Sequence, residues 1–219
     1  MGDFEIGSNV YLNTFMLLFV AVDPVGLAPV FLALTQGTEW AHRRAMAVKG
    51  VALAAAILLG FALAGDRLLQ ALGIGLPAFR IAGGLLLFLL AIDMVFARQS
   101  GLRSTTVGEQ HEAEAKQDIS VFPLAFPLIA GPGALTTVLL LTAGGPAGSQ
   151  GPGLGPVLAL LAAILALTLL SLLSAGWLLS RLGVTGANVI SRLLGLMLAA
   201  LAVQFVVDGV LAVMRMGGY

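Results

Sequence analysis

The chain contains no cysteine, and only 10% of its 219 residues are charged. The lack of cysteine excludes disulfides and thiolate metal sites. An ordinary soluble domain carries about 25% charged residues, so this chain has too few charges to build the polar surface of a soluble fold. The formal net charge is zero, which gives no reason to expect a nucleic-acid partner.

Common catalytic motifs are also absent. The chain has no GxSxG or HExxH pattern and no paired-carboxylate signature. Its two histidines, His42 and His111, are isolated, with no other residue nearby at metal-ligand spacing, so we interpret them as solvated loop residues. We therefore expect no enzymatic activity and no cofactor.

Long apolar runs dominate what is present. Hydrophobic residues make up 59% of the chain and come in blocks close to the roughly 20 residues that a membrane-spanning helix needs. In lipid each backbone polar group must bond within its own segment, so isolated runs of this kind predict helices. The six predicted spans are Val10–Leu34, Arg44–Ala64, Pro77–Phe96, Val121–Ala143, Val157–Leu179 and Ala187–Val213.

Lysine and arginine are missing from the N-terminal segment, MGDFEIGSNVYLNTFMLLFVAV. A signal peptide needs a positive start and a small-residue cleavage site, so we interpret this run as a retained first span. Positive charge gathers in the first, third and fifth connections, as cytoplasmic loops require. The sequence therefore predicts that both termini face outward. The residues that carry this bias are Arg43, Arg44, Lys49, Arg98, Arg103, Lys116 and Arg181.

The two halves of the chain resemble each other. An offset of 108 residues aligns Pro24 with Pro132, and an offset of 112 aligns Arg80 with Arg192. Each half has three spans, an odd number, so the second half must insert upside down. The predicted fold is an all-α membrane protein of six transmembrane helices in two inverted three-helix repeats. The repeats cover 1–96 and 121–219, with a cytoplasmic polar loop at 97–120.

Two proline and glycine breaks interrupt the first and fourth helices near the predicted membrane midplane. The first is Asp23-Pro24-Val25-Gly26 and the second is Gly131-Pro132-Gly133. A single break could be a plain proline kink, but two at matching repeat positions favour a shared binding site. Each creates a half-helix N-terminus, which favours an anion. The predicted substrate-binding residues are Asp23, Pro24, Gly26, Gly131, Gly133, Thr136 and Thr137.

Asp23 is the carboxylate placed deepest in a span. A membrane-embedded carboxylate is costly and indicates function by default. Asp23 could bind a substrate ammonium or a coupling cation, or carry a proton. It could equally cap the second half-helix, and one residue could do both. Asp93 and Asp208 lie near span ends, and we expect them at the interface.

Other polar residues lie within the spans. Arg80 and Arg192 could extend to the interface or form a gating ion pair, and we favour a structural or gating role over direct substrate binding. Asn13 and Gln204 could line a cavity or bond between helices. The acidic residues of the polar loop are best explained as a solvated segment rather than a cation site.

Four segments, in order, resemble the MarC family, which includes the SnatA-type neutral amino acid transporters. They are FVAVDPVGLAPVFLALT, PAFRIAGGLLLFLLAIDMVF, FPLAFPLIAGPGALTTVLLLT and NVISRLLGLMLAALAVQFVVDGV. The resemblance covers nearly the whole chain and extends more distantly to LysE-type exporters. It implies a six-helix protein of a bacterial or archaeal cytoplasmic (inner) membrane that transports glycine, alanine and similar amino acids.

Two functions from different classes remain open at this point. The first is secondary transport of a small neutral amino acid, with a coupling proton or sodium ion because no ATP-binding motif is present. Export of another small metabolite or a drug is a variant of it. The second is a membrane protein that does not transport and binds lipid headgroups through Arg80 and Arg192.

Overall fold

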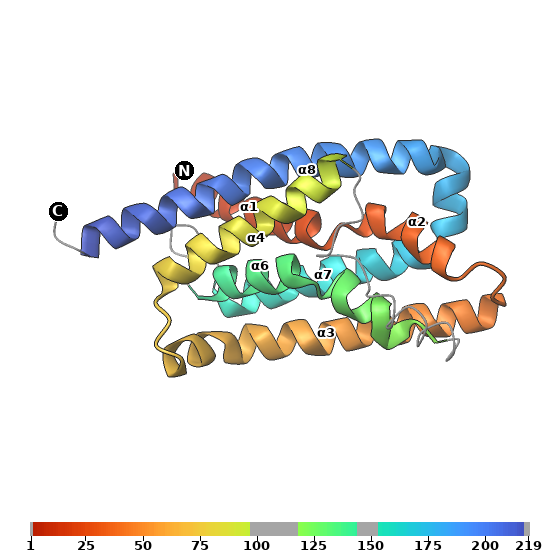
Figure 1. Ribbon diagram of the computed structural model, residues 1–219, viewed down its shortest axis with the longest axis horizontal. Coiled ribbons are helices and arrows are strands. Elements are labelled where there is room, and N and C mark those ends of the chain that lie inside the picture. The colour runs from red at the N-terminus through yellow and green to blue at the C-terminus, as the bar shows by residue number, and fades with distance from the viewer. Residues whose placement is uncertain (1, 97–117, 144–152, 217–219) are drawn as a thin grey trace.

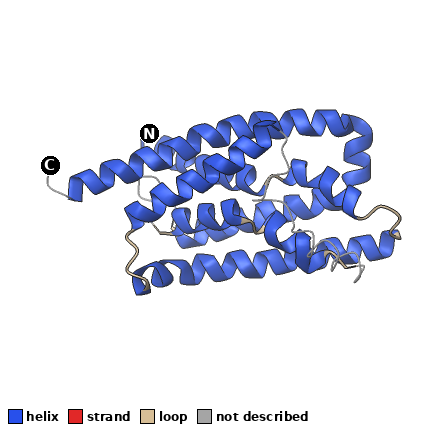
Figure 2. Cartoon of the chain, in the orientation of Figure 1, coloured by secondary structure: helices blue, strands red, loops and turns tan. Residues whose placement is uncertain are grey.

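The computed structural model describes residues 2–96, 118–143 and 153–216, and this part of the chain is helical, with no strand (Figures 1 and 2). The predicted polar loop at 97–120 lies outside the described residues except at 118–120. The helices are α1 (Gly2–Val22), α2 (Pro24–Leu34), α3 (Trp40–Ala71), α4 (Leu76–Phe96), η1 (Ser120–Ile129), α6 (Pro132–Thr142), α7 (Leu154–Leu173) and α8 (Ala175–Met216).

Five helical segments in the described residues are long and apolar enough to cross a membrane. The count rises to six if η1 and α6, which are bent by 55° at their junction, form one span. The chain is therefore an all-helical membrane protein with five to six candidate spans. The first segment, Val10–Leu34, contains α2 and most of α1.

The last two spans divide at a different place from the prediction. The fifth span was expected to reach Leu179, but α7 ends at Leu173 and α8 begins at Ala175. Residues 175–182 form the first turns of α8, which bends at Gly183, where φ is +67°. Only glycine adopts this left-handed conformation at little cost, so the bend depends on Gly183.

The helices run along one long axis (Figure 1). Helix α1 begins and α8 ends toward the same end of the bundle, where the α3–α4 connection also lies. The α2–α3 and α7–α8 connections lie at the opposite end. Helix α4 packs along α8, while α3 and α7 pack against each other and against the broken helices.

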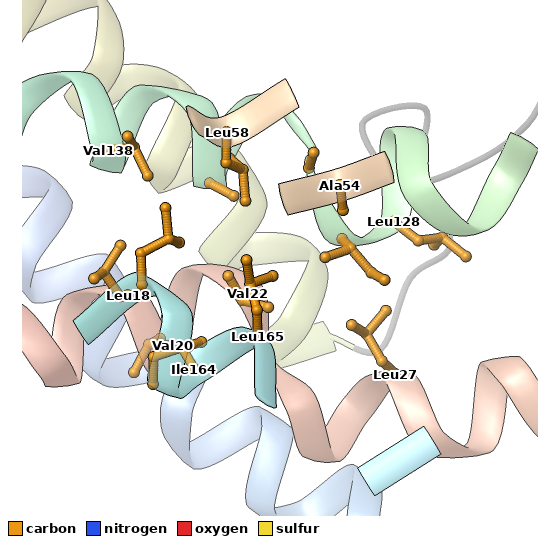
Figure 3. Close-up of a cluster of buried hydrophobic side chains, with 14 of the residues drawn as sticks. Leu18, Val20, Val22, Leu27, Ala54, Leu58, Leu128, Val138, Ile164 and Leu165 are labelled. Carbon is orange, nitrogen blue, oxygen red and sulfur yellow. The ribbon is translucent and has the colours of Figure 1, made fainter. Parts of the chain in front are cut away.

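The centre of the bundle is apolar and is built from both halves of the chain. Leu18 and Val22 of α1 meet Leu58 of α3, Val138 of α6 and Ile164 of α7, and all five are buried (Figure 3). Lipid tails are as apolar as these side chains, so close packing rather than water exclusion holds such helices together.

Helices α4 and α8 approach each other through small residues. A Cβ atom added at Gly84 would lie 2.8 Å from the carbonyl oxygen of Ala202 and 3.1 Å from the backbone nitrogen of Val206. Because these neighbours are backbone atoms, they cannot move aside without shifting the helix. Gly60 on α3 provides a contrast, since a Cβ atom there meets nothing within 4 Å.

We therefore predict that alanine has opposite effects at the two glycines. Gly84→Ala lowers the free energy of unfolding by about 1–3 kcal/mol, because it separates α4 from α8. Gly60→Ala raises the free energy of unfolding by about 0.5–1 kcal/mol, because alanine has a higher helix propensity than glycine and its Cβ atom meets no neighbour there. Denaturation of the purified protein in detergent measures both. Equal effects at the two sites would contradict this packing.

An ion pair ties α3 to the start of η1 at the end of the bundle opposite the termini. Lys49 Nζ lies 2.7 Å from Asp118 Oδ2, and Asp118 Oδ1 accepts hydrogen bonds from the hydroxyl and backbone N–H of Ser120. The hydrogen bond from Lys49, followed by those from Ser120, lowers the pKa of Asp118 from 3.8 to about 2. Folding therefore stabilises the ionised form of Asp118.

We predict that Asp118→Asn lowers the free energy of unfolding by about 0.5–1 kcal/mol at neutral pH, a value discounted for the solvent exposure of the pair. The stabilisation is present above pH 3.8 and disappears as the pH falls through about 2, because the folded-state pKa is the lower one. Thermal unfolding against pH measures this. Asp66→Asn is the control, since Asp66 bonds only within its own helix to Gln70. The same pH profile in both variants would refute the role of the pair.

Candidate functional site

The first helix break is held by Asp23. This residue adopts the left-handed conformation, with φ 54° and ψ 63°, and separates α1 from α2. Its Oδ1 accepts a hydrogen bond of 3.0 Å from the backbone N–H of Gly26, and Pro24 occupies the first position of α2. The capping role expected as one possibility for Asp23 is therefore present, and the carboxylate is 1% exposed.

Two serines from the second half of the chain reach this break. The Ser191 hydroxyl of α8 lies 3.4 Å from Asp23 Oδ1, and the Ser171 hydroxyl of α7 donates a 2.7 Å hydrogen bond to the Pro24 carbonyl. These hydroxyls supply bonds to groups that a lipid environment would leave unsatisfied. Neither serine was predicted, because a contact across 147 or 168 positions leaves no local pattern in the sequence.

The close approach of Asp23 and Ser191 leaves no room for a side chain at position 26. A Cβ atom there would collide with the carboxylate of Asp23 and lie 2.6 Å from the Ser191 hydroxyl. Asp23, Gly26 and Ser191 therefore form one closely packed polar cluster at the start of α2.

The second break has no cap of this kind. Gly131 is extended, with φ −75° and ψ 172°, and no side-chain cap of α6 is found among the described residues. The first intrahelical bond runs from Leu135 N–H to the Gly131 carbonyl, so the N–H groups of Gly133 and Ala134 precede it. Pro132 has no N–H. The α6 N-terminus therefore presents two donors and the positive end of the helix dipole.

A narrow cavity lies at this uncapped N-terminus. It is bordered by α1, α4, η1 and α6, and its walls are apolar side chains together with the backbone of the break. The lining residues are Ala21, Leu86, Leu90, Pro127, Leu128, Gly131, Pro132, Gly133 and Ala134. Ala21 lies in the last turn of α1, two residues before Asp23, so the cavity extends from the second break to the end of α1.

The two predicted threonines differ in their surroundings. Both are buried on α6. The Thr137 hydroxyl donates to the Gly133 carbonyl at 2.8 Å, a bond within its own helix. The Thr136 methyl group packs against Gly83 of α4. Thr136 is thus positioned at the α4–α6 contact, and Thr137 stabilises the first turn of α6.

The other predicted residues lie apart from the cavity lining. Arg80 is buried on α4, whereas Arg192 is exposed on α8, although the two are aligned in the sequence. Asn13 and Gln204 are exposed on the surfaces of α1 and α8, and Gln204 donates to Asp208 at 2.8 Å. The structure therefore groups Asp23, Pro24 and Gly26 at one break and Gly131 and Gly133 at the other, next to the cavity.

Two further carboxylates are buried in the bundle. Asp93 of α4 is 9% exposed and Asp208 of α8 is 8% exposed. Both lie near helix ends, as expected, yet neighbouring helices cover them, which their place in the sequence does not reveal. Asp23 is therefore not the only carboxylate removed from solvent.

Comparison with known proteins identifies the family. Residues 8–214 match the family described as MarC family integral membrane protein. The chain is 38% identical over 200 residues to the UPF0056 membrane protein YvbG of Bacillus subtilis (strain 168), covering 90% of this chain and 92% of that protein.

Two further relatives show the same extent of similarity. The UPF0056 membrane protein MJ1677 of Methanocaldococcus jannaschii is 39% identical over 201 residues, covering 91% of this chain and 95% of that protein. The UPF0056 inner membrane protein YhgN of Escherichia coli (strain K12) is 34% identical over 203 residues, covering 92% and 96%. No solved structure matches this chain. The chain therefore belongs to the MarC family of integral membrane proteins.

Proposed function

We propose that this protein is a secondary transporter of small neutral amino acids such as glycine and alanine, coupled to an ion gradient. The observation that carries the proposal is the N-terminus of α6, which lines a small cavity that also includes Ala21, two residues before the buried Asp23. A zwitterionic amino acid needs an anion site and a cation site a few ångströms apart, in a cavity with little room for a side chain.

The substrate carboxylate would bind at the start of α6. There the N–H groups of Gly133 and Ala134 have no side-chain cap, and the helix dipole favours negative charge. The start of α2 is a poorer anion site, since Asp23 already accepts the Gly26 N–H and brings its own negative charge. The start of α6 would therefore bind the substrate carboxylate, and the start of α2 would not.

The substrate ammonium would face Asp23. Asp23 follows Ala21, a lining residue of the cavity, by two positions on the same chain segment. Oδ1 accepts the capping hydrogen bond from Gly26 and faces Ser191, and the negative charge of the carboxylate would attract the ammonium group of the substrate. Apolar walls from Leu86, Leu90 and Leu128 would restrict the substrate to a small apolar side chain.

The proposal includes an inverted repeat of the two halves, and three features of the helices support it. Helices α2 and α6 each have 11 residues and each begin with proline. They start near the middle of the bundle and run toward opposite ends (Figure 1). The third helices of the two halves, α4 and α8, pack against each other. Inverted repeats with broken helices at a shared site recur among secondary transporters.

The positive charges indicate how the protein is inserted. Arg43, Lys49 and Arg181 belong to segments at the end of the bundle away from the termini. Cytoplasmic loops are enriched in such residues, so we assign this end to the cytoplasm and both termini to the outside. Relatives named as inner membrane proteins favour a bacterial or archaeal cytoplasmic membrane. We propose no enzymatic activity, because the sequence carries no catalytic motif.

We predict that Asp23→Asn lowers glycine uptake into proteoliposomes by about 10- to 100-fold, the effect of losing one charge-assisted hydrogen bond to the substrate. Asparagine retains a capping oxygen, so the fold and the thermal stability are preserved. Asp208→Asn is the matched control, since Asp208 is also buried but bonds to Gln204. Wild-type uptake by Asp23→Asn would contradict the role of Asp23.

A second candidate function is the binding of lipid headgroups without transport. The specific observation in its favour is Arg192, which is exposed on the surface of α8 and available to an anionic headgroup. Arg80, the second arginine of this hypothesis, is buried and therefore does not contribute to a lipid-facing surface.

The two functions predict different ligand responses of the purified protein in detergent. Transport predicts that small neutral amino acids raise the melting temperature, because binding to the folded state stabilises it by mass action. Glycine and alanine would raise the melting temperature. Methylamine, which has only the ammonium group, and acetate, which has only the carboxylate, would not. Stabilisation by anionic lipid, lost in Arg192→Gln and accompanied by no response to any amino acid, would favour the lipid function instead.

A further inference from the structure

Among the described residues, Asp93 is the buried carboxylate with an oxygen that receives no hydrogen bond. It lies in the last turn of α4 and is 9% exposed. Its Oδ2 is fully buried and has no hydrogen-bond partner among the described residues. The other two buried carboxylates do have such partners, since Asp23 accepts from Gly26 and Asp208 from Gln204. A buried carboxylate oxygen without a hydrogen bond is costly, so Asp93 is a candidate for a role other than packing.

The position of Asp93 connects it to the cavity. Leu86 and Leu90 of α4 line the cavity, and Asp93 follows them at spacings of seven and three residues. These spacings place all three side chains on one face of the helix. Asp93 therefore lies one turn beyond Leu90, at the C-terminal end of α4.

One turn of α8 joins this carboxylate to the first helix break. Ser191 faces Asp23, and Gly195 lies against the backbone of Ala91 and the side chain of Met94, which flank Asp93. A change in the charge of Asp93 would therefore act on a turn that also contacts the break. Residues 191–195 of α8 therefore contact both the first break and the last turns of α4, which carry Asp93.

Few charged groups face Asp93 from the neighbouring helices. Helices α6 and η1 contain no titratable side chain between Ser120 and Thr142. Helix α8 contributes Arg192 at this level, but its side chain is exposed, and the start of α2 contributes Asp23. Asp208 and Arg80 lie toward the other ends of α8 and α4. Nothing in the described surroundings of Asp93 neutralises it through an ion pair.

We propose that Asp93 is the binding site of the coupling proton, an inference that rests on the proposed transport function. A proton needs a single oxygen, which Asp93 supplies, whereas a sodium ion needs several oxygen ligands around it. The carboxylate takes a proton from hydronium, leaving water and a neutral carboxylic acid, and returns it to water when the site opens to the other side. In this scheme Asp23 keeps its capping hydrogen bond with Gly26 and its proposed role toward the substrate ammonium.

Infrared difference spectroscopy on the purified protein tests the proton site without any substrate. Lowering the pH in wild type should produce the carbonyl stretch of a protonated carboxylic acid in an apolar environment. Asp93→Asn should lose this band, and Asp208→Asn should retain it. A band that persists in Asp93→Asn assigns the proton to another carboxylate and overturns the proposal, whether or not the protein carries amino acids.

Transport measurements then test the coupling. In proteoliposomes, Asp93→Asn should exchange glycine across the membrane as wild type does, because exchange requires no net proton movement. It should lose all accumulation driven by a pH gradient. Accumulation driven by sodium at constant pH, lost in Asp93→Asn, would overturn the proton assignment. An absence of exchange in wild type would refute the transport function, while the infrared band would still decide the role of Asp93.

Discussion

The fold depends on one constraint, which is that every backbone polar group within lipid must find a partner inside the protein. Within the described residues, helices satisfy the backbone along most of its length, and the breaks leave backbone groups that need other partners. At the first break the Asp23 side chain, the Ser171 hydroxyl and the Ser191 hydroxyl provide partners. At the second break the N–H groups of Gly133 and Ala134 receive no side-chain cap. Because of this difference, the first break is a closed polar cluster, and we propose the ligand site at the second.

The sequence predicts the helical, membrane-embedded character of the chain because apolar runs and proline breaks are local signals. Asp23 and Gly131 stand where the helices break, since proline at the next position cannot continue the preceding helix. The end of α7 at Leu173 was not predicted, because the apolar run continues past it into α8. The bend at Gly183 depends on backbone conformation, which composition does not encode.

The candidate site is predictable only in part. The sequence places Asp23 and Gly133 in broken helices. It does not show that the Asp23 side chain caps α2 whereas the residue before α6, Gly131, provides no such cap. Ser171, Ser191 and Asp93 acquire their roles from contacts between helices far apart in the chain. Arg80 and Arg192 are alike in sequence and differ in burial, because α4 lies inside the bundle at that position while α8 presents its outer surface.

The central claim is that an amino acid binds between the two breaks, with its carboxylate at the start of α6 and its ammonium toward Asp23. An experimental structure of the protein with bound alanine tests this claim most directly. The account predicts ligand density in the cavity bordered by Ala21, Leu90 and Gly133, within hydrogen-bond distance of the Gly133 and Ala134 nitrogens. Density at another place in the bundle, with this cavity closed by side chains, would contradict it.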